Sequence, residues 1–124
     1  MNHNIQDPYI ITYNKVKFMF NNPRLDSILI DDIAHSLSHI CRFTGHVPFH
    51  YSVAQHSLIV SRYVSEKNKM WALMHDAPEC YVNDLATPVK QFVTGEYIRI
   101  HDRIMDKICS KFHIYPRREP EEVE

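Results

Sequence analysis

A proline interrupts the clearest helical pattern of this sequence and leaves polar residues at the break. Residues 69–82 read KMWALMHDAPECYV and begin with good helix formers at apolar spacings of three and four. Pro78 lacks the N–H that would bond the Met74 carbonyl, so the helix ends or kinks before it. Because an uncompensated break costs roughly 3 kcal/mol, a functional role for His75 and Asp76 at this position is worth testing. The alternative is an ordinary helix end.

Length and charge restrict the class of protein. At 124 residues the chain fits one domain with a single core. We predict that residues 1–115 form this domain and that the acidic tail, residues 116–124, is disordered. The net charge is −1 and the basic residues are scattered apart from Arg117 and Arg118. This pattern gives no footprint of a nucleic-acid polymer or a membrane surface, so we expect a small-molecule partner.

The cysteines indicate a reducing compartment. Cys41, Cys80 and Cys109 are odd in number, far apart and without a C-x-x-C pair, which argues against a disulfide framework and a zinc knuckle. The N-terminus lacks a basic region followed by an apolar run, and no stretch has the length of a membrane span. We therefore expect a cytoplasmic protein.

Hydrophobic periodicity predicts an all-α body after a small N-terminal β-hairpin. The hairpin is expected to turn at Asn14 and Lys15, where short apolar and β-branched runs meet. The helices are expected at residues 31–42, 52–65, around Trp71, from Thr87 as N-cap with Pro88 following, and at 96–112. The last helix has an apolar stripe of Tyr97, Ile100, His101, Ile104, Ile108 and Phe112, which leaves Asp102 and Asp106 on the opposite face.

Two histidines and an aspartate form a possible metal-ligand set. His56 falls on the apolar stripe of its helix, with Val53, Val60, Tyr63 and Val64. His75 is predicted on the inward face of a neighbouring helix, and Asp76 adjoins it. Imidazole and carboxylate ligands on facing helices suit a divalent ion such as Mn, Co, Fe or Zn. The alternative is that both histidines are satisfied core residues.

Further carboxylates crowd the same break. Glu79 lies four residues after His75, and Asp84 lies eight after Asp76. Neighbouring carboxylates repel each other unless a cation or a proton intervenes. A divalent ion would hold the irregular segment together and leave a carboxylate for acid–base chemistry. The alternative is a solvated loop.

A polar stripe is predicted upstream. His35, His39 and Arg42 follow an i, i+4, i+7 spacing on one helix face. The histidine pair could bind metal, and Arg42 with Phe43 could hold a phosphate and stack on a base or sugar. A solvated face is the alternative, and His46 lies in the following loop.

Taken in order, these segments resemble a known family. The stretches YSVAQHSLIVSRY and ALMHDAPECYVNDLATPVK, preceded by DIAHSLSHICRFTGH, look like the HD-domain metal-dependent phosphohydrolases. Within that family they are similar to bacterial 5′-deoxynucleotidases and their phage-associated relatives. The resemblance covers residues 22–115 and implies a helical HD-domain bundle.

The resemblance implies roles for individual residues. It implies that His56, His75 and Asp76 are metal ligands, and that Glu79 and Asp84 are catalytic carboxylates. The expected substrate contacts are Arg42, Phe43, His46 and Lys90. The implied activity is release of phosphate from a nucleotide, expected to be a deoxynucleoside 5′-monophosphate. We also expect a homodimer or a higher homo-oligomer.

One ligand expected from the family has no counterpart here. The family completes its metal site with an aspartate on a later helix, and Asp102 is the nearest candidate, although its helical phase points outward. The chain could be a truncated member of the family, or the site could borrow a ligand from another subunit or hold metal weakly with water completing it. Two alternatives to the nucleotidase remain: a deoxynucleoside triphosphate triphosphohydrolase, and a degenerate HD module that binds nucleotides without turnover.

Overall fold

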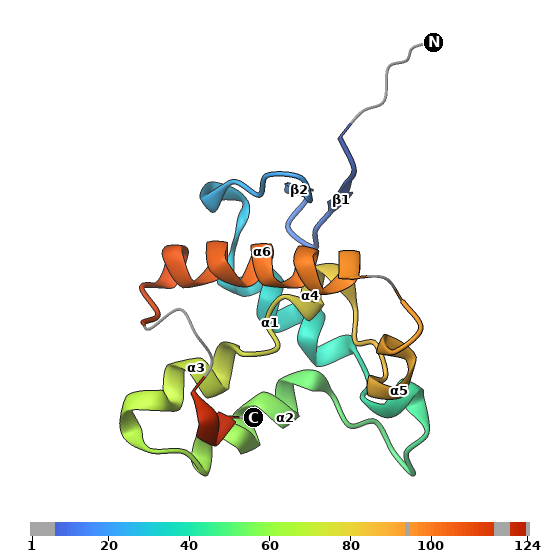
Figure 1. The fold of residues 1–124 in the computed structure, drawn as a ribbon, viewed down its shortest axis with the longest axis vertical. Coiled ribbons are helices and arrows are strands. Elements are labelled where there is room, and N and C mark those ends of the chain that lie inside the picture. Colours follow the sequence, from blue (N-terminus) through green and yellow to red (C-terminus); the bar gives the residue numbers. More distant parts are fainter. Residues whose placement is uncertain (1–6, 94, 116–119, 124) are drawn as a thin grey trace.

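The computed structural model describes residues 7–93, 95–115 and 120–123. These residues form a mostly helical structure with a small antiparallel hairpin near the N-terminus (Figure 1). The strands are β1 (Tyr9–Ile11) and β2 (Lys17–Met19). The α-helices are α1 (Ile30–His39), α2 (Val53–Arg62), α3 (Lys69–Met74), α4 (Glu79–Val82), α5 (Thr87–Lys90) and α6 (Gly95–Phe112). Short 3-10 turns lie at Leu25–Ser27, Phe43–Gly45, Glu66–Asn68 and Glu121–Val123.

The predicted hairpin is confirmed, and its turn is attached to the helical body. Ile10 pairs with Phe18 in the centre of the ladder. Asn14 donates from both its backbone N–H and its side-chain amide to Oδ1 of Asp32, each over 2.8 Å. Asp32 lies in the first turn of α1 and is buried. Since an isolated two-stranded hairpin is at best marginally stable, this attachment and the buried Phe18 side chain hold it in place.

Helix α1 ends earlier than the sequence pattern predicts. Ile40 has an extended backbone, and Cys41 forms an antiparallel bridge with Ser52. Two hydrogen bonds flank this bridge. Arg42 N–H donates to the Tyr51 carbonyl at 2.8 Å, and Val53 N–H, at the start of α2, donates to the Ile40 carbonyl at 2.9 Å. The predicted helix over 31–42 is therefore wrong beyond residue 39. Arg42 does not continue the histidine stripe of α1.

Helix α2 begins with a capping box. The Ser52 hydroxyl accepts from Gln55 N–H, and the Gln55 side chain accepts in return from Ser52 N–H. This arrangement satisfies N–H groups that a helix start leaves unbonded. The helix ends at Arg62 rather than at 65, so the predicted inward position of Tyr63 is wrong, because this side chain is 83% exposed.

The break at Pro78 is confirmed. Helix α3 ends at Met74, residues 75–78 form a turn, and Pro78 caps the start of α4. Within the turn, Ala77 N–H donates to the Met74 carbonyl at 2.9 Å. Helix α5 starts one residue earlier than expected, with Ala86 as its N-cap, which is within the usual uncertainty of helix boundaries.

Helix α6 packs the predicted stripe into the core. Ile104 and Ile108 are fully buried, and Ile100 and Phe112 pack partly against the same cluster. Burial of each isoleucine is worth roughly 1.5–3 kcal/mol. In Figure 1, α6 runs across the molecule with the hairpin on one side and α2 and α3 on the other. Among the described residues, no helix combines the length and apolar character needed to cross a bilayer.

The C-terminal turn differs from the disorder expected of the tail. Glu121–Val123 forms a 3-10 turn beside α2 and α3 (Figure 1), and Val123 is buried in the core cluster. The Glu122 carboxylate accepts hydrogen bonds from the backbone N–H and the hydroxyl of Ser65 and from the Asn68 amide. Burial of the valine and these bonds hold the turn. Residues 116–119 and 124, also in the expected tail, lie outside the described residues.

Candidate metal centre and its cleft

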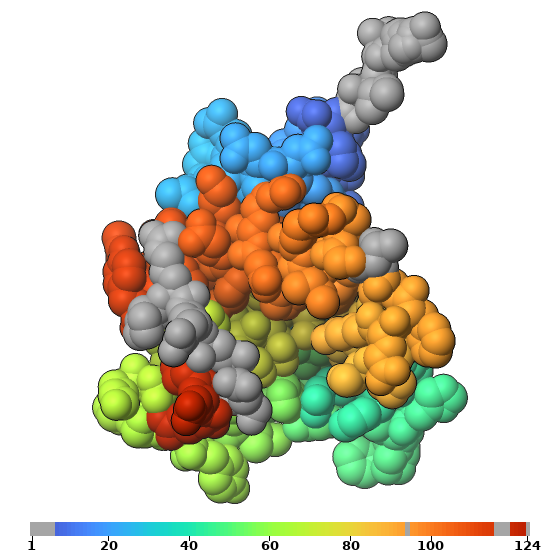
Figure 2. Space-filling view, viewed as in Figure 1, coloured from blue at the N-terminus to red at the C-terminus, as the bar shows by residue number. Residues whose placement is uncertain are grey.

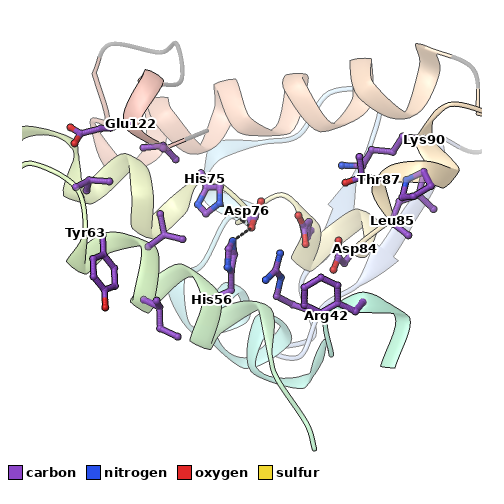
Figure 3. Close-up of a pocket in the computed structure, with 18 residues that line it drawn as sticks. Arg42, His56, Tyr63, His75, Asp76, Asp84, Leu85, Thr87, Lys90 and Glu122 are labelled. Carbon is purple, nitrogen blue, oxygen red and sulfur yellow. Dashed lines mark ion pairs between the residues drawn. The ribbon is translucent and has the colours of Figure 1, made fainter. Parts of the chain in front are cut away.

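Three side chains converge where the helix breaks. One donor atom each from His56, His75 and Asp76 lies within 4.8 Å of the other two. Oδ2 of Asp76 is 3.1 Å from Nε2 of His75 and 3.6 Å from Nε2 of His56. Figure 3 shows the three side chains pointing toward one another from α2 and from the turn after α3. The sequence-predicted ligand set is thus brought together.

The hydrogen bonding of His75 prepares it for a cation. Nδ1 of His75 lies 2.6 Å from the Ala72 carbonyl, and a carbonyl can only accept, so Nδ1 carries the proton. The lone pair of Nε2 is then available on the side of Asp76. A histidine fixed in this way by a backbone carbonyl is the usual arrangement around bound metal ions.

The charge states of Asp76 and His56 also suit a metal. Burial opposes ionisation of Asp76, but the adjacent His75 and the hydrogen bond with Glu79 outweigh it, and the pKa of Asp76 is lowered. Burial, followed by the positive charge of Arg42, lowers the pKa of His56. An ionised carboxylate and a neutral imidazole are the forms that bind metal. The donor set therefore fits a divalent ion such as Mn, Co, Fe or Zn.

Glu79 lies beside this group, and its carboxyl pKa is raised. Its side chain is buried at the first position of α4, where burial and then the negative charge of Asp76 raise its pKa. A hydrogen bond links the Glu79 and Asp76 carboxyl groups. Two adjacent carboxyl groups with opposite pKa shifts are a common arrangement in acid–base catalysis.

The cluster lies in a cleft of about 920 Å³. Its lining residues come mainly from α2, the break between α3 and α4, residues 84–90 and the C-terminal turn, and Figure 2 shows the surface hollowed between α5 and α2. Of the predicted site residues, Arg42, Phe43, His56, His75, Asp76, Glu79, Asp84 and Lys90 all line this cleft. His46 is exposed and is not among the lining residues, so the structure does not bring it to the site.

Arg42 is positioned by the aromatic rings beside it. Its guanidinium carbon lies 4.6 Å from the centre of the Phe43 ring and 5.5 Å from that of Tyr51. Phe43 itself is exposed at the cleft with a positive φ of 58°. In Figure 3, Arg42 lies beside His56 and Asp84, which places a cationic side chain next to the candidate metal ligands.

Asp84 follows an unusual backbone conformation. Asn83 ends α4 with φ 72° and ψ 169°, a region that costs a non-glycine residue roughly 1–3 kcal/mol. Its side-chain Oδ1 accepts from Asp84 N–H at 2.8 Å, and its carbonyl accepts from the Tyr97 hydroxyl at 2.9 Å. The predicted burial of Tyr97 is therefore only partial, and its hydroxyl has a role that the apolar stripe did not reveal.

The apolar half of the cleft is lined by Ile59, Val60, Tyr63, Val64 and Val123. Val60, Tyr63 and Val64 belong to the stripe predicted to contain His56, whereas the sequence does not indicate the contribution of Val123. The outward direction predicted for Asp102 is confirmed, since its side chain is 74% exposed and lies 3.7 Å from His101. Among the described residues, one cluster of side chains could hold a metal ion, and it consists of His56, His75 and Asp76. The histidines of α1 instead form a stack with Tyr13.

Comparisons with known proteins give relatives without an assigned activity. The chain is 40% identical over 108 residues to the uncharacterized protein YfdR of Escherichia coli, covering 87% of this chain and 60% of YfdR. It is 34% identical over 110 residues to an uncharacterized protein of Rhodobacter capsulatus, covering 76% of this chain and 56% of that protein. No protein-family model matches the sequence. The chain thus spans less than two thirds of the length of either relative.

Proposed function

We propose that this chain is a metal-dependent phosphohydrolase of the HD-domain class that releases phosphate from a nucleotide. The favoured substrate is a deoxynucleoside 5′-monophosphate. The observation that carries the proposal is the convergence of two histidines and an ionised aspartate beside Arg42 in one cleft. The family resemblance of the residues around His56 and around His75 and Asp76 supports the same conclusion.

The residues of the cleft have complementary roles in this proposal. His56, His75 and Asp76 would hold the divalent ion, which polarises a phosphate oxygen and activates water when bound. Arg42 and Lys90 would bind the phosphate charge from the protein side. Phe43, exposed at the cleft, would stack on the base or the sugar.

The two proposed catalytic carboxyl groups would transfer protons on opposite sides of the phosphate, one with the attacking water and the other with the leaving group. Asp84 would accept the proton of the attacking water, since it lines the cleft and its charge acts on His56. Glu79, whose buried carboxyl keeps its proton, would donate to the leaving oxygen of the nucleoside. The products are then inorganic phosphate and a nucleoside.

The proposal extends to assembly and location. A second copy of the chain would supply a further carboxylate if the protein forms the homodimer or higher oligomer that we expect. Within the described residues no disulfide joins the cysteines, in agreement with a reducing cytoplasm, where nucleotides are found. Analytical ultracentrifugation with and without Mn²⁺ tests the assembly.

The direct test is phosphate release by the purified protein. We expect deoxynucleoside monophosphates to yield inorganic phosphate with added Mn²⁺ or Co²⁺, and chelation to abolish the reaction. Asp76→Asn is the inactive control. Absence of turnover with every nucleotide tested, in protein that retains metal, would refute the proposal.

Two other activities have specific support. A triphosphohydrolase would use the same cleft, whose volume of about 920 Å³ accommodates a longer phosphate chain; tripolyphosphate as product identifies it. A nucleotide-binding module without turnover is favoured by the small donor set among the described residues, which lacks the later aspartate of the family. Nucleotide binding by calorimetry without phosphate release identifies that case.

A further inference from the structure

Tyr97 connects helix α6 to the segment that carries Asp84. It lies in the first turns of α6, and its hydroxyl donates to the Asn83 carbonyl at 2.9 Å. This bond spans 14 residues of sequence. It joins α6, which follows α5 in the chain, to the segment between α4 and α5. Tyr97 does not line the cleft itself. Its hydroxyl therefore acts on the backbone beside the cleft.

Asn83 is the point at which this backbone changes direction. Its N–H donates to the Glu79 carbonyl at 2.8 Å, which closes α4, and its side chain accepts from Asp84 N–H. Its φ of 72° with ψ of 169° is rarely adopted by a residue with a side chain. Such a conformation persists only when the surroundings impose it, and the Tyr97 hydrogen bond is a constraint from outside the segment.

The electrostatics agree with this geometry. Burial, then the charges of Glu79 and Asp84, raise the pKa of Tyr97. The phenol therefore remains protonated at neutral pH and continues to donate to the Asn83 carbonyl.

We infer that Tyr97 is a positioning residue for catalysis, which holds Asn83 in its left-handed conformation and thereby directs Asp84 into the cleft. The inference rests on the proposed phosphohydrolase function. It assigns no contact with substrate to Tyr97. Loss of the hydroxyl would release the turn at Asn83 and leave the metal ligands of α2 and the α3–α4 break in place.

Tyr97→Phe removes the hydroxyl and keeps the ring. We expect kcat for the deoxynucleoside monophosphate to fall about 10- to 100-fold, the cost typical of a misplaced catalytic group, with KM and metal content unchanged. In an Asp84→Asn background the same change should have no further effect, because residues that act as one unit are not additive. Tyr13→Phe, in the N-terminal hairpin, is the matched control and should keep full activity.

Crystal structures of the wild type and Tyr97→Phe provide a second readout that needs no activity. We expect Asn83 to leave its positive φ and Asp84 to shift in the variant. The inference is overturned if Tyr97→Phe keeps the wild-type kcat, if its loss is the same with and without Asp84, or if the turn at Asn83 is unchanged. If the wild type releases no phosphate at all, the proposed function fails, and the two crystal structures alone decide the positioning role.

Discussion

His75 donates from Nδ1 to the carbonyl oxygen of Ala72 over 2.6 Å, three residues earlier in the chain. The bond spans the end of α3, where Ala72 is fully buried. It determines which nitrogen of the ring faces Asp76, 3.1 Å away. The helix break thus fixes the tautomer of the histidine as well as its direction, and the ring needs no reorganisation to bind an ion.

Metal content should depend on His75. We expect His75→Ala to lose most of the divalent ion that co-purifies with the wild type, because one of the three converging donors is removed. Elemental analysis by mass spectrometry, without chelators in the buffers, measures this. His113→Ala, an exposed histidine outside the cleft, should keep wild-type metal. Equal metal in all three proteins would mean that no ion binds at this cluster.

Asp102 should be dispensable, unlike Asp76. Turning Asp102 inward would require α6 to rotate and expose Ile104 and Ile108, each worth roughly 1.5–3 kcal/mol of burial. We therefore expect Asp102→Asn to keep both metal and phosphate release, while Asp76→Asn loses both. Phosphate release with added Mn²⁺ compares the two variants. A folded but inactive Asp102→Asn would show that α6 completes the metal site.

Arg42→Ala should weaken substrate binding. Loss of one charge-assisted contact to phosphate costs about 1.5–3 kcal/mol, which corresponds to a rise in KM of about 10- to 150-fold. Steady-state kinetics measures it, and thermal unfolding checks the fold. Arg24→Ala provides the control, because Arg24 pairs on the surface with Asp26 and is absent from the cleft lining. An unchanged KM in Arg42→Ala would remove this residue from the substrate site.

Glu79→Gln should remove a pH dependence of stability in chelator-treated protein. Burial and the charge of Asp76 raise the pKa of Glu79 above its ordinary value of 4.5. Above pH 4.5 the folded state therefore keeps a proton on Glu79 that the unfolded chain releases. The free energy of unfolding of the wild type therefore falls as pH rises, until Glu79 ionises in the folded state. Above about pH 7 the titration of His56 does not make the free energy of unfolding rise with pH, since the pKa of His56 is lowered from 6.5.

Urea unfolding at about pH 7 and pH 8.5 measures this slope. We expect wild type to lose stability over this interval and Glu79→Gln to remain nearly constant. The exposed residue Glu66 offers the matched control, and Glu66→Gln should behave as wild type. Identical slopes in wild type and Glu79→Gln would show that Glu79 is ionised in the folded protein.

Asn14→Ala should destabilise the fold and spare the cleft. The side chain provides one of the two hydrogen bonds to Oδ1 of the buried Asp32, and its loss is worth about 1–3 kcal/mol. Denaturant unfolding measures the change. Asn21→Ala removes a comparable bond to Asp7 on the surface and should cost less. Equal stability of the two variants would mean that Asp32 does not depend on Asn14.

Local signals were enough to predict much of this structure. Pro78 places the helix break by removing a backbone donor, and the apolar spacing of α6 directs Asp102 outward. The candidate ligand set could be selected because His56 falls on the apolar stripe of its helix and His75 with Asp76 falls at the helix break. Each of these signals depends on residues within a few positions of each other.

The errors concern features that depend on long-range contacts. Helix α1 stops at His39 because Cys41 pairs with Ser52 across 11 positions, which periodicity does not indicate. The C-terminal turn is hydrogen-bonded to Ser65, far away in the sequence. The apolar stripe predicts burial of Tyr97, although its hydroxyl donates to the Asn83 carbonyl. Pairings of this kind appear only once the chain is folded.

The bridge between Cys41 and Ser52 closes the loop of residues 42–51 beside the cleft. Ser52 caps the helix that carries His56, and Arg42 directly follows Cys41. The spacing between Arg42 and His56, the proposed phosphate contact and the proposed metal ligand, is therefore set at the base of the loop. Under the proposed function, changes in residues 44–50 would leave this spacing intact, so this loop is where substrate preference could change without a change in the proposed chemistry.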